Sequence, residues 1–237
     1  MQYIFYTAIA LIPSLIWLLY FLRKDKHPEP RLMVLMVFIW GMLVAFPALI
    51  VESIAIEILL PIVSVPSIIA DIVKYLFVVS VAEEIAKYLV VKFRVIDRTI
   101  QLDEPVDAME YMIISALGFA AIENIFLLTP LFDSQFVPTL NLAFSRFIGA
   151  TFLHVLASAT IGYYIALSLY KPHKKTRLLI HGFLIAILMH GFYNIFVTKA
   201  VSQPYLFVAV VIIIGFSAYM ISKYFQKVSS MKSITQI

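Results

Sequence analysis

The sequence contains no cysteine. This absence excludes disulfide bonds, a thiolate metal site and a cysteine nucleophile. Any metal ion held by this chain would therefore need histidine and carboxylate ligands.

Charged residues are scarce as well: only 14% of the 237 residues are Asp, Glu, Lys or Arg, whereas 62% are hydrophobic. A soluble domain is typically about 45–50% apolar, and the mean hydropathy of this chain is +0.97. These values are typical of a polytopic membrane protein, whose main partner is the lipid bilayer. The formal charge of +4 fits basic loops that set membrane topology, so no nucleic-acid partner is expected.

Long apolar runs, in contrast, are abundant. Seven of them have about the 20 residues that a helix needs to cross a bilayer core. The alternating pattern of a membrane β-barrel is absent, so all of them are expected to be helices. The sequence predicts an all-α polytopic protein with one integral-membrane domain, 1–237, and spans at 3–22, 32–51, 68–92, 106–129, 142–170, 178–198 and 205–222.

The segment 52–67 between the second and third spans is apolar but too short to cross a bilayer. Pro61 and Pro66 interrupt it, and proline breaks a helix interior. We therefore expect an interfacial or re-entrant segment on the outer side of the membrane.

Lysine and arginine alternate between dense and sparse loops. Cytoplasmic loops are enriched in these residues, so the dense set is expected to be cytoplasmic, with the N-terminus outside and the C-terminus inside. The opposite loops hold only Lys199. The dense set holds fourteen of the eighteen basic residues: Arg23, Lys24, Lys26, Arg31, Lys92, Arg94, Arg98, Lys171, Lys174, Lys175, Arg177, Lys223, Lys227 and Lys232.

Three ionisable residues, Glu83, Glu84 and Lys87, lie inside the third span. Each costs about 2.5–3.5 kcal/mol at the centre of a lipid-exposed helix. They are therefore expected to face the interior of the bundle or a water-filled cavity. In one interpretation Lys87 neutralises one carboxylate while the other faces the cavity, where it is available as a general base.

Polar residues of three further spans fall at a similar depth. With a rise of 1.5 Å per residue, Glu123 and Asn124, His154, and His190 lie within a slab about 12 Å thick that also contains the two glutamates of the third span. One cavity can hold all of them. Arg146 either reaches the outer surface or meets Glu123 at the same depth; the sequence leaves both options open.

Four motifs follow one another on successive spans: "EEIAK" at 83–87, "FAAIEN" at 119–124, "HVLAS" at 154–158 and "HGFYN" at 190–194. Together they resemble the PrsW family of intramembrane proteases, which is related to the type II CAAX prenyl endopeptidases and the Abi proteins. The resemblance covers about 70–198. It implies an endopeptidase in a prokaryotic plasma membrane that hydrolyses a peptide bond of a membrane protein or peptide.

The resemblance also implies roles for the motif residues. Glu83 and Glu84 would supply the general base, and the other members of the catalytic set would be Glu123, Asn124, His154 and His190. If Zn²⁺ is the cofactor, His154 and His190 would be its ligands together with Glu123 or Glu84.

Two versions of the chemistry stay open. In the first, which we prefer, Zn²⁺ lowers the pKa of a bound water and Glu83 or Glu84 acts as base. In the second, a glutamate activates water directly, while histidine and asparagine stabilise the oxyanion. The HExxH motif of soluble zinc peptidases is absent, so the ligands would come from different helices.

A proton-coupled transporter is the main alternative, because buried carboxylates and histidines also form proton relays. Carriers often contain paired repeats or helices interrupted at matching positions, and neither feature is visible here. A catalytically silent binding protein is a third class, but it gives no reason for two glutamates and two histidines at one depth.

Overall fold

The computed structural model describes residues 2–23, 28–62, 66–97, 102–131 and 136–231. Within these ranges the chain is helical and contains no strand. The α-helices are α1 (Gln2–Leu22), α2 (Arg31–Ile62), α3 (Ser67–Asp71), α4 (Ser80–Val91), α5 (Asp107–Leu128), α6 (Phe136–Ile148), α7 (Ala150–Tyr170), α8 (Lys175–Ala200) and α9 (Phe207–Val228). Two π-helical segments, η1 (Ile72–Val79) and η2 (Lys92–Ile96), flank α4, and short 3-10 turns occur at Thr129–Leu131, Pro172–Lys174 and Pro204–Leu206.

The predicted all-α membrane architecture is confirmed. Six segments of the described chain are long and apolar enough to cross a bilayer: Ile4–Leu22, Arg31–Leu59, Asp107–Leu128, Thr139–Tyr170, Pro172–Ala200 and Pro204–Val228. A seventh long helix is assembled from α3, η1, α4 and η2, which follow one another without interruption. This composite helix corresponds to the predicted span 68–92 and carries the buried charges.

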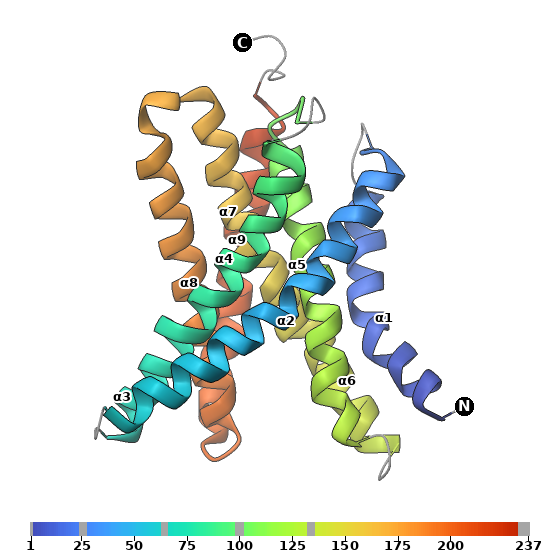
Figure 1. Ribbon diagram of the computed structural model, residues 1–237, viewed down its shortest axis with the longest axis vertical. Helices are drawn as coiled ribbons and strands as arrows, with labels where there is room; N and C mark the ends of the chain where they lie inside the picture. The colour runs from blue at the N-terminus through green and yellow to red at the C-terminus, as the bar shows by residue number, and fades with distance from the viewer. Residues whose placement is uncertain (1, 24–27, 63–65, 98–101, 132–135, 232–237) are drawn as a thin grey trace.

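The prediction of a separate segment at 52–67 was wrong. The chain continues as α2 as far as Ile62, through Pro47 and Pro61. Proline removes one backbone hydrogen bond and disturbs the turn before it, so Pro61 affects only the last turns of the helix. With 32 residues, α2 is about 48 Å long, more than the bilayer core requires, and it crosses the bundle obliquely (Figure 1).

The predicted span 142–170 consists of two helices. A break at Gly149, where φ is −92° and ψ is −93°, separates α6 from α7. A Cβ at this position would crowd the hydroxyl of Tyr193 and the carbonyl oxygen of Ser145, so glycine allows the close approach. The break redirects the chain between Arg146 on α6 and His154 on α7.

The middle of the bundle is formed by α5 and α7. In the spans Asp107–Leu128 and Thr139–Tyr170, which contain α5 and α7, 78% of the residues in the most apolar stretch are buried. The corresponding share is 17% for the span Pro204–Val228, which contains α9. α5 packs against α7, α2 and α1, while α7 also packs against α8 and α9. Polar side chains on the inner faces of α5 and α7 are therefore shielded from lipid.

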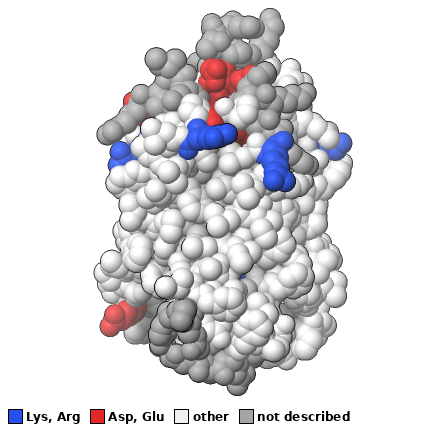
Figure 2. Space-filling view, turned by 90° about the vertical axis from the view of Figure 1, so that its right-hand side faces the viewer, with Lys and Arg blue, Asp and Glu red and all other residues white. Residues whose placement is uncertain are grey.

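Charged side chains gather toward one end of the molecule. The C-terminal ends of α1, α4, α7 and α9, which lead into the basic segments, lie at the end opposite the N-terminus (Figure 1). On the face shown in Figure 2, lysines and arginines lie in a band near this end with acidic residues above them, and the middle of the face is almost entirely uncharged. This distribution fits a bundle that spans a bilayer, while its sidedness stays a prediction. Four of the fourteen basic residues of the dense loops, Lys24, Lys26, Arg98 and Lys232, lie outside the described residues.

Candidate active site

The two glutamates and the lysine of α4 are all buried inside the bundle. The ammonium of Lys87 donates to Glu83 Oε2 at 3.1 Å and to Glu84 Oε1 at 2.8 Å. The spacings i, i+3 and i, i+4 bring all three groups together on one side of the helix. Lys87 therefore forms ion pairs with both carboxylates, rather than with one as the sequence suggested.

His154 on α7 bridges two of these charged groups. Its Nδ1 lies 2.8 Å from Lys87 Nζ, and its Nε2 lies 2.8 Å from Glu123 Oε2 on α5. A lysine ammonium has only donors and a carboxylate only acceptors. The arrangement therefore assigns the lone pair to Nδ1 and the hydrogen to Nε2.

His190 on α8 is held in a similar way. Its Nδ1 lies 2.9 Å from Glu84 Oε1, so Nδ1 donates and the lone pair belongs to Nε2. The ring stands edge-on to that of His154, with centroids 4.9 Å apart. Both imidazoles thus have a carboxylate on one nitrogen and a lone pair on the other.

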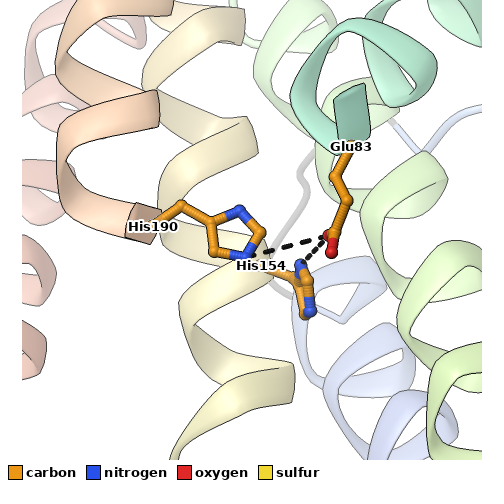
Figure 3. A group of neighbouring side chains, drawn as sticks. All are labelled: Glu83, His154 and His190. Carbon is orange, nitrogen blue, oxygen red and sulfur yellow. Dashed lines mark ion pairs between the residues drawn. The ribbon is translucent and has the colours of Figure 1, made fainter. Parts of the chain in front are cut away.

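The two lone-pair nitrogens converge on Glu83. Its Oε2 lies 3.6 Å from His154 Nδ1 and 3.8 Å from His190 Nε2, and all three ligand atoms lie within 4.8 Å of one another (Figure 3). Two imidazoles and a carboxylate are a common ligand set of catalytic zinc. Carboxylates behind the imidazoles are the usual second layer of such sites, so the residues present fit a divalent cation.

Lys87 competes with a metal ion for this position. Its ammonium uses the His154 Nδ1 lone pair at 2.8 Å and also contacts Glu83 Oε2. One lone pair serves one partner at a time, so metal binding requires the ammonium to move away from Nδ1. The aromatic ring of Phe119, whose centroid is 4.5 Å from Lys87 Nζ, lies on another side of the ammonium and stabilises its charge.

The structure brings five of the predicted site residues into direct contact, but their arrangement differs from the expected one. Glu83, rather than Glu84 or Glu123, supplies the carboxylate nearest both lone pairs. Glu84 and Glu123 lie behind the histidines and orient them. Ser158, one turn after His154 on α7, donates to Glu84 Oε2 at 3.1 Å.

Asn124, the sixth predicted residue, lies beside this cluster. Its amide nitrogen donates to Thr151 Oγ1 at 3.2 Å, and its oxygen accepts from Arg146. Arg146 also pairs with Glu123 Oε2 at 2.9 Å, which decides between the two options that the sequence left for this arginine. Asn124 therefore supports the arginine that neutralises Glu123.

One acidic residue near the site was missed. Glu52 on α2 is buried and lies within electrostatic range of Glu83, Glu123 and Lys87. The sequence analysis ended the second span at residue 51, which placed Glu52 in an interfacial segment. The i, i+3, i+7 spacing of Ala45, Ala48 and Glu52 was the available signal, because it puts all three on one helix face.

A model of the PrsW family of intramembrane metalloproteases matches residues 29–220, which include every residue of the site. This chain belongs to that family. It is 29% identical to the Protease PrsW of Geobacillus kaustophilus, over 79% of this chain and 77% of the relative. It is also 29% identical to the Protease PrsW of Oceanobacillus iheyensis, over 83% and 84% of the two chains, and to that of Clostridioides difficile, over 78% and 76%. No solved structure matches the chain.

Membership of the PrsW family identifies the chain as a PrsW-like intramembrane protease. It confirms the family resemblance found in the four motifs and does not favour the proton-coupled transporter. The site described above lies on the central helices of the bundle, where a protease acting within a membrane needs its polar groups.

Proposed function

We propose that this PrsW-family protein hydrolyses a peptide bond of a membrane-associated protein, and that Glu83 is the carboxylate at which the attacking water is activated. The observation that carries this proposal is the convergence of Glu83 Oε2 with the lone-pair nitrogens of His154 and His190. A buried carboxylate beside the lone pair of His190 Nε2 is a position where a water molecule can be held and deprotonated.

The other residues have orienting roles. Glu84 is bound by Lys87, Ser158 and His190, so its oxygens are already engaged and it fixes the His190 ring. Glu123 holds His154 through Nε2 and is itself balanced by Arg146. These contacts leave Glu83 as the glutamate of the pair that faces both lone pairs.

Zn²⁺ or another divalent cation would be held by Glu83, His154 and His190, and in that version Glu83 would be a metal ligand rather than the base. When bound, such an ion supplies Lewis-acid polarisation of the scissile carbonyl group. Without it, the ammonium of Lys87 is the positive charge closest to the reacting groups, and it stabilises negative charge that develops there. In both versions Glu84 and Glu123 keep the imidazoles in the same orientation.

The test is cleavage of a library of membrane peptides by purified, detergent-solubilised protein. The variants are Glu83→Gln, Glu84→Gln, His154→Ala and His190→Ala, with Glu57→Gln as the matched control, because Glu57 lies on α2 and is exposed. We expect Glu83→Gln to lower kcat at least a hundredfold, the usual range for loss of a general base, and the control to behave as wild type.

Metal content is measured on the same samples. Loss of bound zinc from Glu83→Gln and both histidine variants, with retention in the control, supports the metal version. Full cleavage by folded Glu83→Gln would refute its role. If folded wild type leaves every peptide intact but moves protons or solutes across vesicle membranes, the protein is a carrier and the proposal is wrong.

A further inference from the structure

Glu52 is a buried carboxylate with an unused hydrogen-bonding atom. Only 7% of its surface is exposed, and its Oε1 has no hydrogen-bond partner among the described residues. Nearly all buried polar atoms in folded proteins are hydrogen-bonded. A buried acceptor without a partner costs about 1–3 kcal/mol, so its presence in the membrane-spanning part of α2 needs an explanation.

The packing of α2 directs Glu52 toward the active site. Ala45 and Ala48, on the same face, pack in one cluster with Ala86 on α4 and Phe119 on α5. From Ala48 to Glu52 the chain advances one turn toward the end of the bundle where α2 terminates (Figure 1). α5 runs in the same direction as α2, so Glu123 lies one turn beyond Phe119 toward that end. α4 runs in the opposite direction, so Glu83 lies about one turn beyond Ala86 toward the same end.

The charges around Glu52 agree with this placement. The carboxyl group of Glu52 lies within electrostatic range of Glu83, Glu123 and Lys87. Lys87 already donates to Glu83 and Glu84. No ion pair with Glu52 occurs in the described part of the chain, so the fold obtains little stability from this residue.

We propose that Glu52 is a substrate-contacting residue of the protease, and that its Oε1 accepts a hydrogen bond from a backbone N–H of the bound substrate segment. The proposal rests on the proposed function. A helical substrate must lose local helical hydrogen bonds before its peptide bond becomes accessible, and in a membrane the released N–H groups have no water to bind. An unused acceptor beside the reacting carboxylate provides the missing partner.

A substrate role also explains why this residue is tolerated. Replacing a buried, unpartnered polar group by an apolar one of similar shape is typically neutral or stabilising. Active sites commonly keep such costly groups because they are satisfied only in the complex. Stability and activity should therefore respond to substitution in opposite directions, which a purely structural glutamate would not produce.

The test compares Glu52→Leu and Glu52→Gln with Glu57→Leu, an exposed glutamate on the same helix. We expect Glu52→Leu to unfold at the same or a higher temperature than wild type and to lose about tenfold in kcat/KM, the worth of one hydrogen bond. Gln keeps an acceptor oxygen and should recover most of this loss. Glu57→Leu should match wild type in both measurements.

A second measurement identifies the atom contacted. After the cleaved bond has been mapped by mass spectrometry, ester linkages replace single amides on either side of it, which removes one N–H at a time. At one position the ester should slow cleavage by wild type about tenfold. It should leave cleavage by Glu52→Leu unaffected, because that variant already lacks the hydrogen bond to the substrate N–H. Equal losses in both proteins at every position would overturn the assignment.

The outcomes separate this inference from the proposed function. If wild type cleaves and folded Glu52→Leu has the same kcat/KM, only the role of Glu52 is refuted. If Glu52→Leu is inactive because it unfolds, the residue is structural and the inference is wrong. If wild type cleaves nothing, the proposed function fails and the inference fails with it.

Discussion

Lys87 is the residue on which the candidate site depends most. Its buried ammonium contacts Glu83, Glu84 and His154, which come from two helices. A cation between the two carboxylates offsets part of their mutual repulsion in a medium of low dielectric constant. A bound metal ion would supply the same compensation, so Lys87 and the metal are alternative counter-charges for one set of ligands.

Replacing Lys87 by methionine tests this relation. Without metal, Lys87→Met should lose about 3–5 kcal/mol of stability, the cost of breaking a buried ion pair from one side. Added zinc should raise its thermal unfolding temperature more than that of wild type, because the His154 Nδ1 lone pair is free and ligand binding stabilises the folded state. The measurement is thermal unfolding in detergent with and without zinc.

Lys74→Met serves as the comparison, because Lys74 lies on the same composite helix but is partly exposed. It should change stability little and show the zinc response of wild type. Equal stability of Lys87→Met and wild type, or equal zinc responses, would mean that Lys87 does not share the metal position.

At the scale of helices, the site depends on how closely α2 and α5 approach each other. Their crossing is made by two glycines: a Cβ at Gly41 would overlap the backbone of Ser115, and one at Gly118 would overlap the carbonyl of Phe38. Small residues at such crossings let membrane helices pack backbone to backbone. This approach brings the face of α2 that carries Glu52 next to α4 and α5.

A methyl group at the crossing should therefore separate the two helices. We expect Gly118→Ala to destabilise the protein by about 1–3 kcal/mol, the usual cost of overpacking, and to lower the cleavage rate because Glu123 lies on the displaced helix. Gly215→Ala on α9 is the control, since a Cβ there meets no atom within 4 Å. Unfolding temperature and cleavage rate are measured for both, and similar values would contradict this account of the crossing.

At the scale of the whole molecule, lipid replaces water around the bundle. Many large apolar side chains of α1, α2 and α9 are exposed on its surface, whereas the polar groups of the site are enclosed by α4, α5, α7 and α8. The basic segments collect at one end (Figure 2). The positive-inside rule predicts that this end is cytoplasmic.

Reporter fusions measure this orientation. A fluorescent protein joined after Ile237 should be active, and alkaline phosphatase at the same place should be inactive, because its disulfides do not form in the reducing cytoplasm. A fusion after Ser202, between α8 and α9, should give the opposite result. Phosphatase activity at the C-terminus would reverse the assigned topology.

The sequence by itself determined the helical membrane architecture and the depth of the polar groups. Apolar runs of bilayer length must be helical, and the rise of 1.5 Å per residue gives each side chain its approximate level. For this reason Glu83, Glu84, Glu123, His154 and His190 could be predicted to meet.

Only the tertiary structure decided which atoms meet. The rotation, tilt and curvature of each helix come from packing against its neighbours, not from its own hydropathy. A rotation of α4 by about 100° would exchange the positions of Glu83 and Glu84, and the direction of α6 brings Arg146 to Glu123. Glu52 was missed because the predicted second span ended at residue 51, whereas α2 continues to Ile62 and carries a fourth carboxyl group toward the site.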